Sequence, residues 1–309
     1  MSRPPRLCAV SVDLDEIPNY FAIHGLPAPD GAVAHAVYQT ALDRLDAFAA
    51  SHQIPLTLFA VGSDACHGES ASVLRRMVGH GHEVANHSLD HRYDLTQLPL
   101  VEMRRQVVGA IEAIESCVGQ RPTGFRAPGY VVSDALIDVL RDAGVRYDSS
   151  VFPCPAYYGA KAAAMGAIAL RGRSSRSIVD HPRVLMAPSR PYLLGRPYTS
   201  RGEGPLELPV QVTRGARLPY IGTTLTLAGP RKARWLTRMV LGEPLINLEL
   251  HGIDLLDATD GLAALVPHQP DVKIPLERKL ETLAEVVRMV RKADYSFVRL
   301  DEAADALGG

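Results

Sequence analysis

This sequence of 309 residues contains few cysteines and carries almost no net charge. The formal net charge of −1 gives no reason to expect a nucleic-acid partner or a membrane-surface partner, although a balanced total does not exclude a local basic patch. The cysteines show no Cys-x-x-Cys spacing, so we expect buried free thiols rather than a disulfide or a zinc–thiolate site. The four cysteines are Cys8, Cys66, Cys117 and Cys154.

Long apolar runs are also missing. No stretch approaches the length of a membrane span, so no transmembrane segment is expected. The apolar run at residues 7–12 is too short for the core of a signal peptide, and acidic residues follow it directly. These two absences predict a cytoplasmic protein. Because 47% of the residues are hydrophobic and 22% are charged, the chain can nevertheless bury a substantial core.

Apolar segments of strand length alternate with segments of helical periodicity, which predicts parallel β/α units. Strands are expected at residues 7–12, 55–61, 81–86, 123–126, 145–148, 246–251 and 296–300, and helices at 31–51, 69–80, 98–117, 133–143 and 275–292. Residues 154–230 break this pattern because they are rich in Pro, Gly and Arg. We interpret them as an insertion that covers the active face of a single catalytic domain, residues 1–309.

The most informative motif is the pair His87 and His91. If this stretch is a helical turn, both imidazoles lie on one face and can hold one metal ion. An isolated pair of this kind is more often a core or surface feature. Zinc and similar divalent ions accept imidazole nitrogen and carboxylate oxygen, so the two histidines and Asp15 would supply three protein ligands and leave a position open for water.

Other polar residues follow predicted strands, where open α/β sheets and barrels carry their chemistry. Asp13 and Asp15 follow the first strand, so one can bind a metal while the other acts as general base, unless both only cap a turn. Arg126 ends a strand and is either an ordinary ion-pair partner or part of a site. Tyr130 either packs or presents its backbone N–H to an oxyanion. His251 suits a general acid because its pKa lies near neutrality, although a solvated loop histidine is the commoner case.

In order, the segments read Asp-x-Asp, His-x-x-x-His, Arg-x-Pro-x-Tyr and Asp-Ser-Ser, and the late histidine follows. This ordered set resembles the polysaccharide deacetylase family, the NodB-homology domain, over roughly residues 7–153 and 246–303. The resemblance implies an α/β fold: a distorted or incomplete (β/α) barrel with a long insertion. The first motif, Ser-Val-Asp-Leu-Asp-Glu, departs from the commonest Thr-Phe-Asp-Asp-Gly form and resembles a branch with an Asp-x-Asp motif.

By that comparison each candidate residue has a role, and the reverse assignment of Asp13 and Asp15 stays open. The implied ligands of a divalent metal ion, zinc by default, are Asp15, His87 and His91. The implied catalytic residues are Asp13 as general base, Arg126 as its orienting partner, His251 as general acid and Tyr130 as N–H donor to the oxyanion.

The resemblance implies a metal-dependent hydrolase that removes an N-acyl group, expected to be acetyl, from an amino sugar. Because a cytoplasmic chain does not meet mature cell-wall polymer, we expect a small or lipid-linked N-acyl sugar as the partner. A deformylase or cyclic-amide hydrolase of the same fold, and a non-catalytic sugar-binding member, are the alternatives. Aromatic and basic residues of the insertion are available to contact a sugar or phosphate: Tyr157, Tyr158, Arg171, Arg173, Arg176 and Tyr192.

Overall fold

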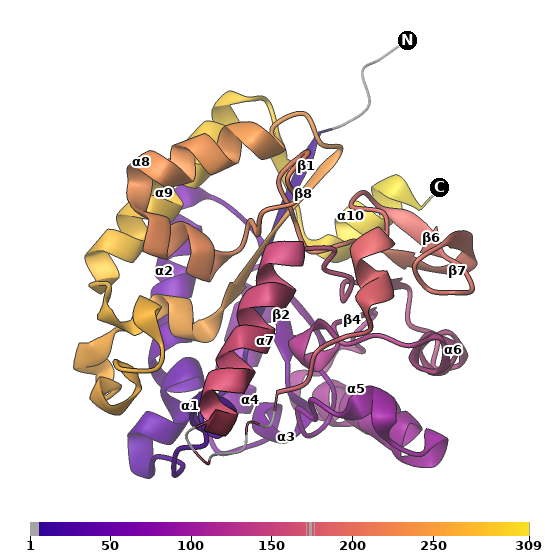
Figure 1. The fold of residues 1–309 in the computed structure, drawn as a ribbon, viewed down its shortest axis with the longest axis horizontal. Coiled ribbons are helices and arrows are strands. Elements are labelled where there is room, and N and C mark those ends of the chain that lie inside the picture. The colour runs from indigo at the N-terminus through magenta and orange to yellow at the C-terminus, as the bar shows by residue number, and fades with distance from the viewer. Residues whose placement is uncertain (1–5, 171, 173–174, 176, 309) are drawn as a thin grey trace.

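The computed structural model describes residues 6–170, 172, 175 and 177–308. Its strands are β1 (Leu7–Asp13), β2 (Leu56–Ala60), β3 (Glu83–Asn86), β4 (Gly124–Phe125), β5 (Tyr147–Asp148), β6 (Tyr192–Leu194), β7 (Arg201–Glu207), β8 (Leu245–His251) and β9 (Ser296–Phe297). They form one curled sheet in the order β6-β7-β5-β4-β3-β2-β1-β8, and β9 pairs with β1 (Figure 1). Within the described ranges no ladder joins β8 to β6, so the barrel is incomplete and the predicted fold class is confirmed.

Helices surround this sheet. They are α1 (Ile17–Ile23), α2 (Leu42–His52), α3 (Gly62–Ala65), α4 (Ser70–Gly79), α5 (Leu100–Val118), α6 (Asp134–Asp142), α7 (Pro155–Leu170), α8 (Gly222–Val240), α9 (Leu276–Lys292) and α10 (Leu300–Leu307). The Ser133 hydroxyl caps α6 by accepting from Leu136 N at 3.2 Å. Gly119 ends α5 in the left-handed region, with φ +84°.

The register of β1 sets the position of the chemistry. β1 is buried along its whole length because parallel strands flank it on both sides. Asp13, its last residue, lies opposite Phe59 of β2 and opposite His251 of β8. Main-chain pairing alone therefore brings Asp13 and His251 to the same edge of the sheet.

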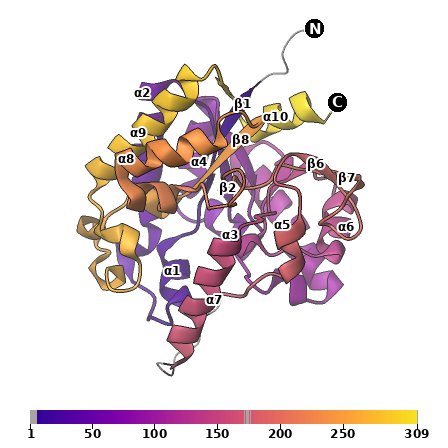
Figure 2. The ribbon, with the colours of Figure 1, turned by 45° about the horizontal axis from the view of Figure 1, so that its top comes forward.

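Residues 154–230 contain more regular structure than the sequence predicts. β7 joins the central sheet beside β5 and pairs Glu207 with Asp148, so part of this segment extends the sheet. The helix α7 crosses in front of the sheet in Figure 1, and its end projects from the body of the molecule in Figure 2. The segment therefore combines sheet and covering helix, and its description as an insertion within one catalytic domain stays a prediction.

The expectation of four free thiols is wrong for two of the cysteines. Cys66 and Cys117 form a disulfide with a Cα–Cα distance of 5.7 Å, while Cys8 and Cys154 are free and buried. The pairing follows from close packing of α3 on α5, because a Cβ on Gly62 would lie only 3.0 Å from Ala110 Cα. Sequence spacing carries no sign of this contact.

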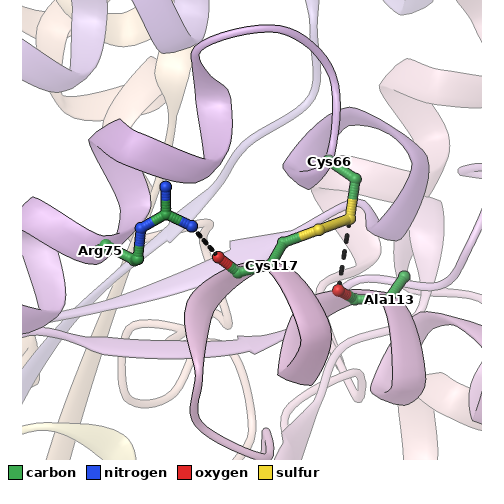
Figure 3. The surroundings of a disulfide bond; sticks show 4 residues. All are labelled: Cys66, Arg75, Ala113 and Cys117. Atoms are coloured by element: carbon green, nitrogen blue, oxygen red, sulfur yellow. Dashed lines mark hydrogen bonds between the residues drawn. A yellow bond between two sulfur atoms is a disulfide. The ribbon is translucent and has the colours of Figure 1, made fainter.

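Neighbouring groups complete the surroundings of the disulfide (Figure 3). Arg75 of α4 donates to the Cys117 carbonyl at 2.5 Å, which satisfies a backbone acceptor in the last turn of α5. Cys66 Sγ lies 3.3 Å from the Ala113 carbonyl oxygen.

Among the helices of the described ranges, none has the length and apolar character needed to cross a lipid bilayer.

Candidate active site

Three predicted metal ligands converge at the carboxyl edge of the sheet. His91 Nε2 lies 3.0 Å from Asp15 Oδ1, and His87 Nε2 lies 3.2 Å from the same oxygen. All three residues are buried. Burial raises the pKa of Asp15, but the two imidazoles outweigh this effect and hold that pKa well below its usual range. The three residue types thus meet as the sequence predicts.

The segment that carries the histidines is a bent loop, so the helical turn considered for it is not formed. Ser88 and His91 both adopt left-handed backbone conformations, with φ of +68° and +49°. Ser88 N donates to Asn86 Oδ1 at 2.8 Å, and Gln106 of α5 accepts from two loop amides, at 2.9 Å through its carbonyl and at 3.0 Å through its side chain. Gln106 therefore shapes the loop, although it lies far from the motif in the sequence.

The ligand atoms fit a divalent metal ion. Asp15 Oδ1, His87 Nε2 and His91 Nε2 are buried and make no hydrogen bond. Buried polar atoms are almost always paired, so three unpaired ligand atoms around one point fit the donor set of a divalent cation. His87 Nδ1 donates to the Arg126 carbonyl at 2.8 Å, which leaves the Nε2 lone pair facing the other two ligands.

Arg126 is fully buried and orients Asp13. Its Nη1 donates to Asp13 Oδ1 at 2.7 Å, while Asp13 Oδ2 lies 3.8 Å from His87 Nε2. One carboxylate oxygen is thus fixed by the guanidinium and the other faces the metal ligands. The Arg126 guanidinium also lies over the Phe59 ring, with its Cζ 4.1 Å from the centroid.

A second group of polar residues, which the sequence analysis missed, holds Arg126. Its Nη2 donates to Ser11 Oγ at 2.9 Å and to Ser149 Oγ at 2.8 Å. Asn247 links both serines, because it accepts from Ser11 Oγ and donates to Ser149 Oγ, each at 2.9 Å. Ser11 and Asn247 are polar residues inside otherwise apolar strands, and that pattern was the available signal.

His251 is paired with a buried carboxylate. Its Nδ1 lies 2.9 Å from Oε1 of Glu249, a fully buried residue on the same strand. Burial lowers the pKa of His251, but the negative charges of Glu249 and Asp13 outweigh it and raise that pKa well above its usual value. Glu249 was missed too. Its signal was the Glu-x-His alternation, because residues two apart on a strand share a face.

Tyr130 sits between the two halves of the site. It adopts φ +61° directly after Gly129 at φ +64°, and its hydroxyl lies 3.5 Å from His251 Nε2. Its backbone N–H donates to the Ala127 carbonyl at 3.0 Å. An oxyanion would have to compete with that carbonyl, so the oxyanion role stays a prediction.

The start of α7 packs against the Tyr130 turn. Tyr157 contacts the Tyr130 ring edge-on at 5.7 Å between centroids, and the Tyr158 hydroxyl donates to the Tyr130 carbonyl at 3.4 Å. Tyr192 instead donates its hydroxyl to the Tyr198 carbonyl at 2.8 Å. The remaining insertion candidates, Arg171, Arg173 and Arg176, lie outside the described residues.

A surface hollow borders the metal ligands. It has a volume of about 480 Å³ and is lined by Asn19, Ala22, Asp90, His91, Arg92, Tyr93 and Asp94. This volume lies within the range of small-molecule sites. His91 therefore connects the buried ligand cluster to a space that a small ligand can enter.

Comparisons with known proteins agree on one family. Residues 30–147 match the family model described as polysaccharide deacetylase. A chitooligosaccharide deacetylase of Sinorhizobium fredii is 36% identical over 97 residues, which are 31% of this chain and 44% of that protein. A peptidoglycan deacetylase of Helicobacter pylori is 23% identical over 147 residues, 47% of this chain and 49% of that protein. The chain thus spans less than half the length of these curated relatives.

Solved structures show the same fold. A Mycobacterium smegmatis protein with a provisional polysaccharide deacetylase name superposes with a TM-score of 0.61 at 20% identity, covering 100% of this chain and 93% of that chain. A CE4 family pseudoenzyme of Bacillus anthracis gives a TM-score of 0.53 at 13% identity, covering 98% of this chain and 67% of that chain. The family model over residues 30–147, the curated deacetylases and the shared fold together support the assignment of this chain to the polysaccharide deacetylase family.

Proposed function

We propose that this chain is a metal-dependent N-deacetylase that hydrolyses the linear amide of an N-acetylated amino sugar. One observation carries the proposal. Three unpartnered ligand atoms, from Asp15, His87 and His91, meet beside Asp13, which Arg126 fixes by one oxygen at 2.7 Å. The relatives named chitooligosaccharide deacetylase support an N-acetylated sugar as the substrate. Zinc is the expected metal, because the donor set combines imidazole nitrogen and carboxylate oxygen.

The protein groups suit the two proton transfers of amide hydrolysis. A divalent cation held by Asp15, His87 and His91 would supply Lewis-acid chemistry, polarising the amide carbonyl and making water more acidic. Asp13 accepts a proton from the attacking water through Oδ2, the oxygen that Arg126 leaves free. His251, kept protonated by Glu249, donates a proton to the nitrogen as the C–N bond breaks. The products are acetate and the free amine of the sugar.

A small substrate is the second part of the proposal. The hollow beside His91, at about 480 Å³, has a size that suits one or two sugar rings, which favours a small substrate over a long polymer. A length series of N-acetylated chitooligosaccharides tests this part. We expect kcat/KM to level off by the dimer. A steady rise from dimer to hexamer would indicate an open polymer groove and contradict it.

Acetate release tests the activity itself. The protein, stripped with a chelator and reloaded with Zn²⁺, should release one acetate per N-acetyl group cleaved from diacetylchitobiose, and the stripped protein should release none. Formate from an N-formyl sugar without acetate from its N-acetyl counterpart would favour the deformylase, and ring opening of a cyclic amide would favour the cyclic-amide hydrolase. Metal-loaded protein that binds sugar but turns over none of these substrates would identify a non-catalytic member. The Bacillus anthracis pseudoenzyme shows that the fold alone does not decide between these outcomes.

A further inference from the structure

Lys161, beside the Gly129–Tyr130 turn, is a cation without an anionic partner among the described residues. It is the one charged residue in the sequence of α7, and the half-buried side chain reaches the Gly129 turn. It donates to the Gly129 carbonyl at 3.1 Å and lies 5.6 Å from the centroid of the Tyr157 ring. Among the described residues it forms no ion pair. An ammonium group has three N–H donors, and the Gly129 carbonyl accepts from one of them, so two donors have no anion to bind.

The position of Lys161 links it to the reaction centre. Gly129 directly precedes Tyr130, whose hydroxyl lies 3.5 Å from His251 Nε2. A Cβ placed on Gly129 would meet Tyr93 at 2.9 Å and Lys161 Nζ at 3.3 Å, so these two side chains flank the same point. Tyr93 in turn packs edge-on against His91, at 4.9 Å between centroids. Tyr93 therefore separates the ammonium from the proposed metal ligand His91, and Tyr130 separates it from the proposed general acid His251.

The surroundings leave this cation poorly solvated. Burial lowers the pKa of Lys161 to about 8, and the more distant Asp180 offsets this effect only in part. Asp180 is itself engaged by the Tyr198 hydroxyl at 3.1 Å and by the His181 amide at 2.6 Å. A desolvated ammonium gains free energy when an anion arrives, because ion pairing restores what burial removed.

We propose that Lys161 forms an anion subsite that binds the phosphate of a phosphorylated N-acetyl sugar while the amide lies at the metal ligands. This inference rests on the proposed function for the identity of the sugar. Phosphate is favoured over carboxylate because a single ammonium acts as a point charge and suits a phosphate oxygen, whereas planar carboxylates are matched by the fork of an arginine. A nucleotide-linked sugar and a lipid-linked sugar both present this group.

Binding measurements on the whole, metal-depleted protein test the subsite, because removal of the metal prevents phosphate from binding there. Calorimetry compares N-acetylglucosamine with its 1-phosphate in wild type, Lys161→Met, Lys161→Arg and the control Lys232→Met, an exposed lysine on α8. In wild type and the control we expect the phosphate to bind about tenfold tighter or more than the neutral sugar. That ratio should fall toward one in Lys161→Met and be largely kept in Lys161→Arg. If Lys161→Met does not fold by circular dichroism, Lys161→Gln replaces it.

Two results would overturn the inference: no preference for the phosphorylated sugar in wild type, or an unchanged preference in Lys161→Met. Equal weakening of both ligands in Lys161→Met would give an unchanged preference and would assign Lys161 a purely structural role. Acetate release from neutral diacetylchitobiose by the metal-loaded wild type judges the proposed function separately, so the two failures are distinguishable. UDP-N-acetylglucosamine and a prenyl-phosphate-linked N-acetylglucosamine, added as further ligands, distinguish the nucleotide source from the lipid source.

Discussion

Replacing Glu249 by glutamine should make His251, the proposed general acid, titrate at a lower pH. Opposite unit charges at the observed 2.9 Å attract by about 6 kcal/mol in a medium of effective dielectric constant about 20. The cost of burying both groups cancels part of this attraction, so we expect the pKa of His251 to fall by about 1–3 units. Glutamine keeps the size of the side chain and can still accept from Nδ1–H, so the change isolates the charge.

The assay is the pH dependence of kcat. His251 must be protonated to donate to the amine, so the basic limb of the profile reports its pKa in the complex. In Glu249→Gln this limb should move to lower pH by about 1–3 units, and kcat at neutral pH should fall accordingly. The control is Glu281→Gln, an exposed acid on α9, which should leave the profile unchanged. A basic limb that stays in place in Glu249→Gln would refute the assignment of Glu249 as the residue that keeps His251 charged.

Four further substitutions test the site and its support. His87→Ala and His91→Ala should each lose bound zinc by elemental analysis, whereas exposed His80→Ala should keep it, and a folded double variant at full occupancy would refute the ligand assignment. Asp13→Asn should retain metal but lose about 10²–10⁴ in kcat, and near-normal turnover would exclude it as the base. Burial raises the pKa of Glu207 well above its usual range, so its proton is lost at higher pH in the folded state than in the unfolded state. The free energy of unfolding should therefore fall as the pH rises above the ordinary carboxyl range, by up to about 1.4 kcal/mol per pH unit, and urea titrations of Glu207→Gln should show a flatter profile.

Local patterns were enough to predict parallel β/α units, whereas the incomplete barrel was implied by the family resemblance. The largely apolar β1 and the alternating β8 are the kind of segment that periodicity identifies, and parallel pairing then fixes Asp13 opposite His251. The pattern was less informative at residues 154–230. There α7 is apolar almost all round, and β7 begins with exposed polar residues, so neither shows the periodicity of an ordinary half-buried element.

The candidate site was predictable at residues whose chemical type stands out, and not where tertiary contacts decide the geometry. His87 and His91 come together although their loop is not helical, because Gln106 of a distant helix holds the turn. Asn247 acts on Arg126 through two serines, Ser11 of β1 and Ser149, which directly follows β5. Such roles depend on contacts between segments that no local spacing records.

The disulfide bears on the compartment in which the protein matures. Cys66 and Cys117 lie on either side of the histidine motif, so their bond closes a ring, with a sequence separation of 51 residues, that contains two of the three proposed metal ligands. Such bonds persist in oxidising surroundings and are rare in the reducing cytosol of mesophiles. A disulfide between Cys66 and Cys117 in the native protein therefore argues against the cytoplasmic location expected from the sequence. Mass spectrometry of the protein from its native host, with free thiols blocked at lysis, would decide which one holds.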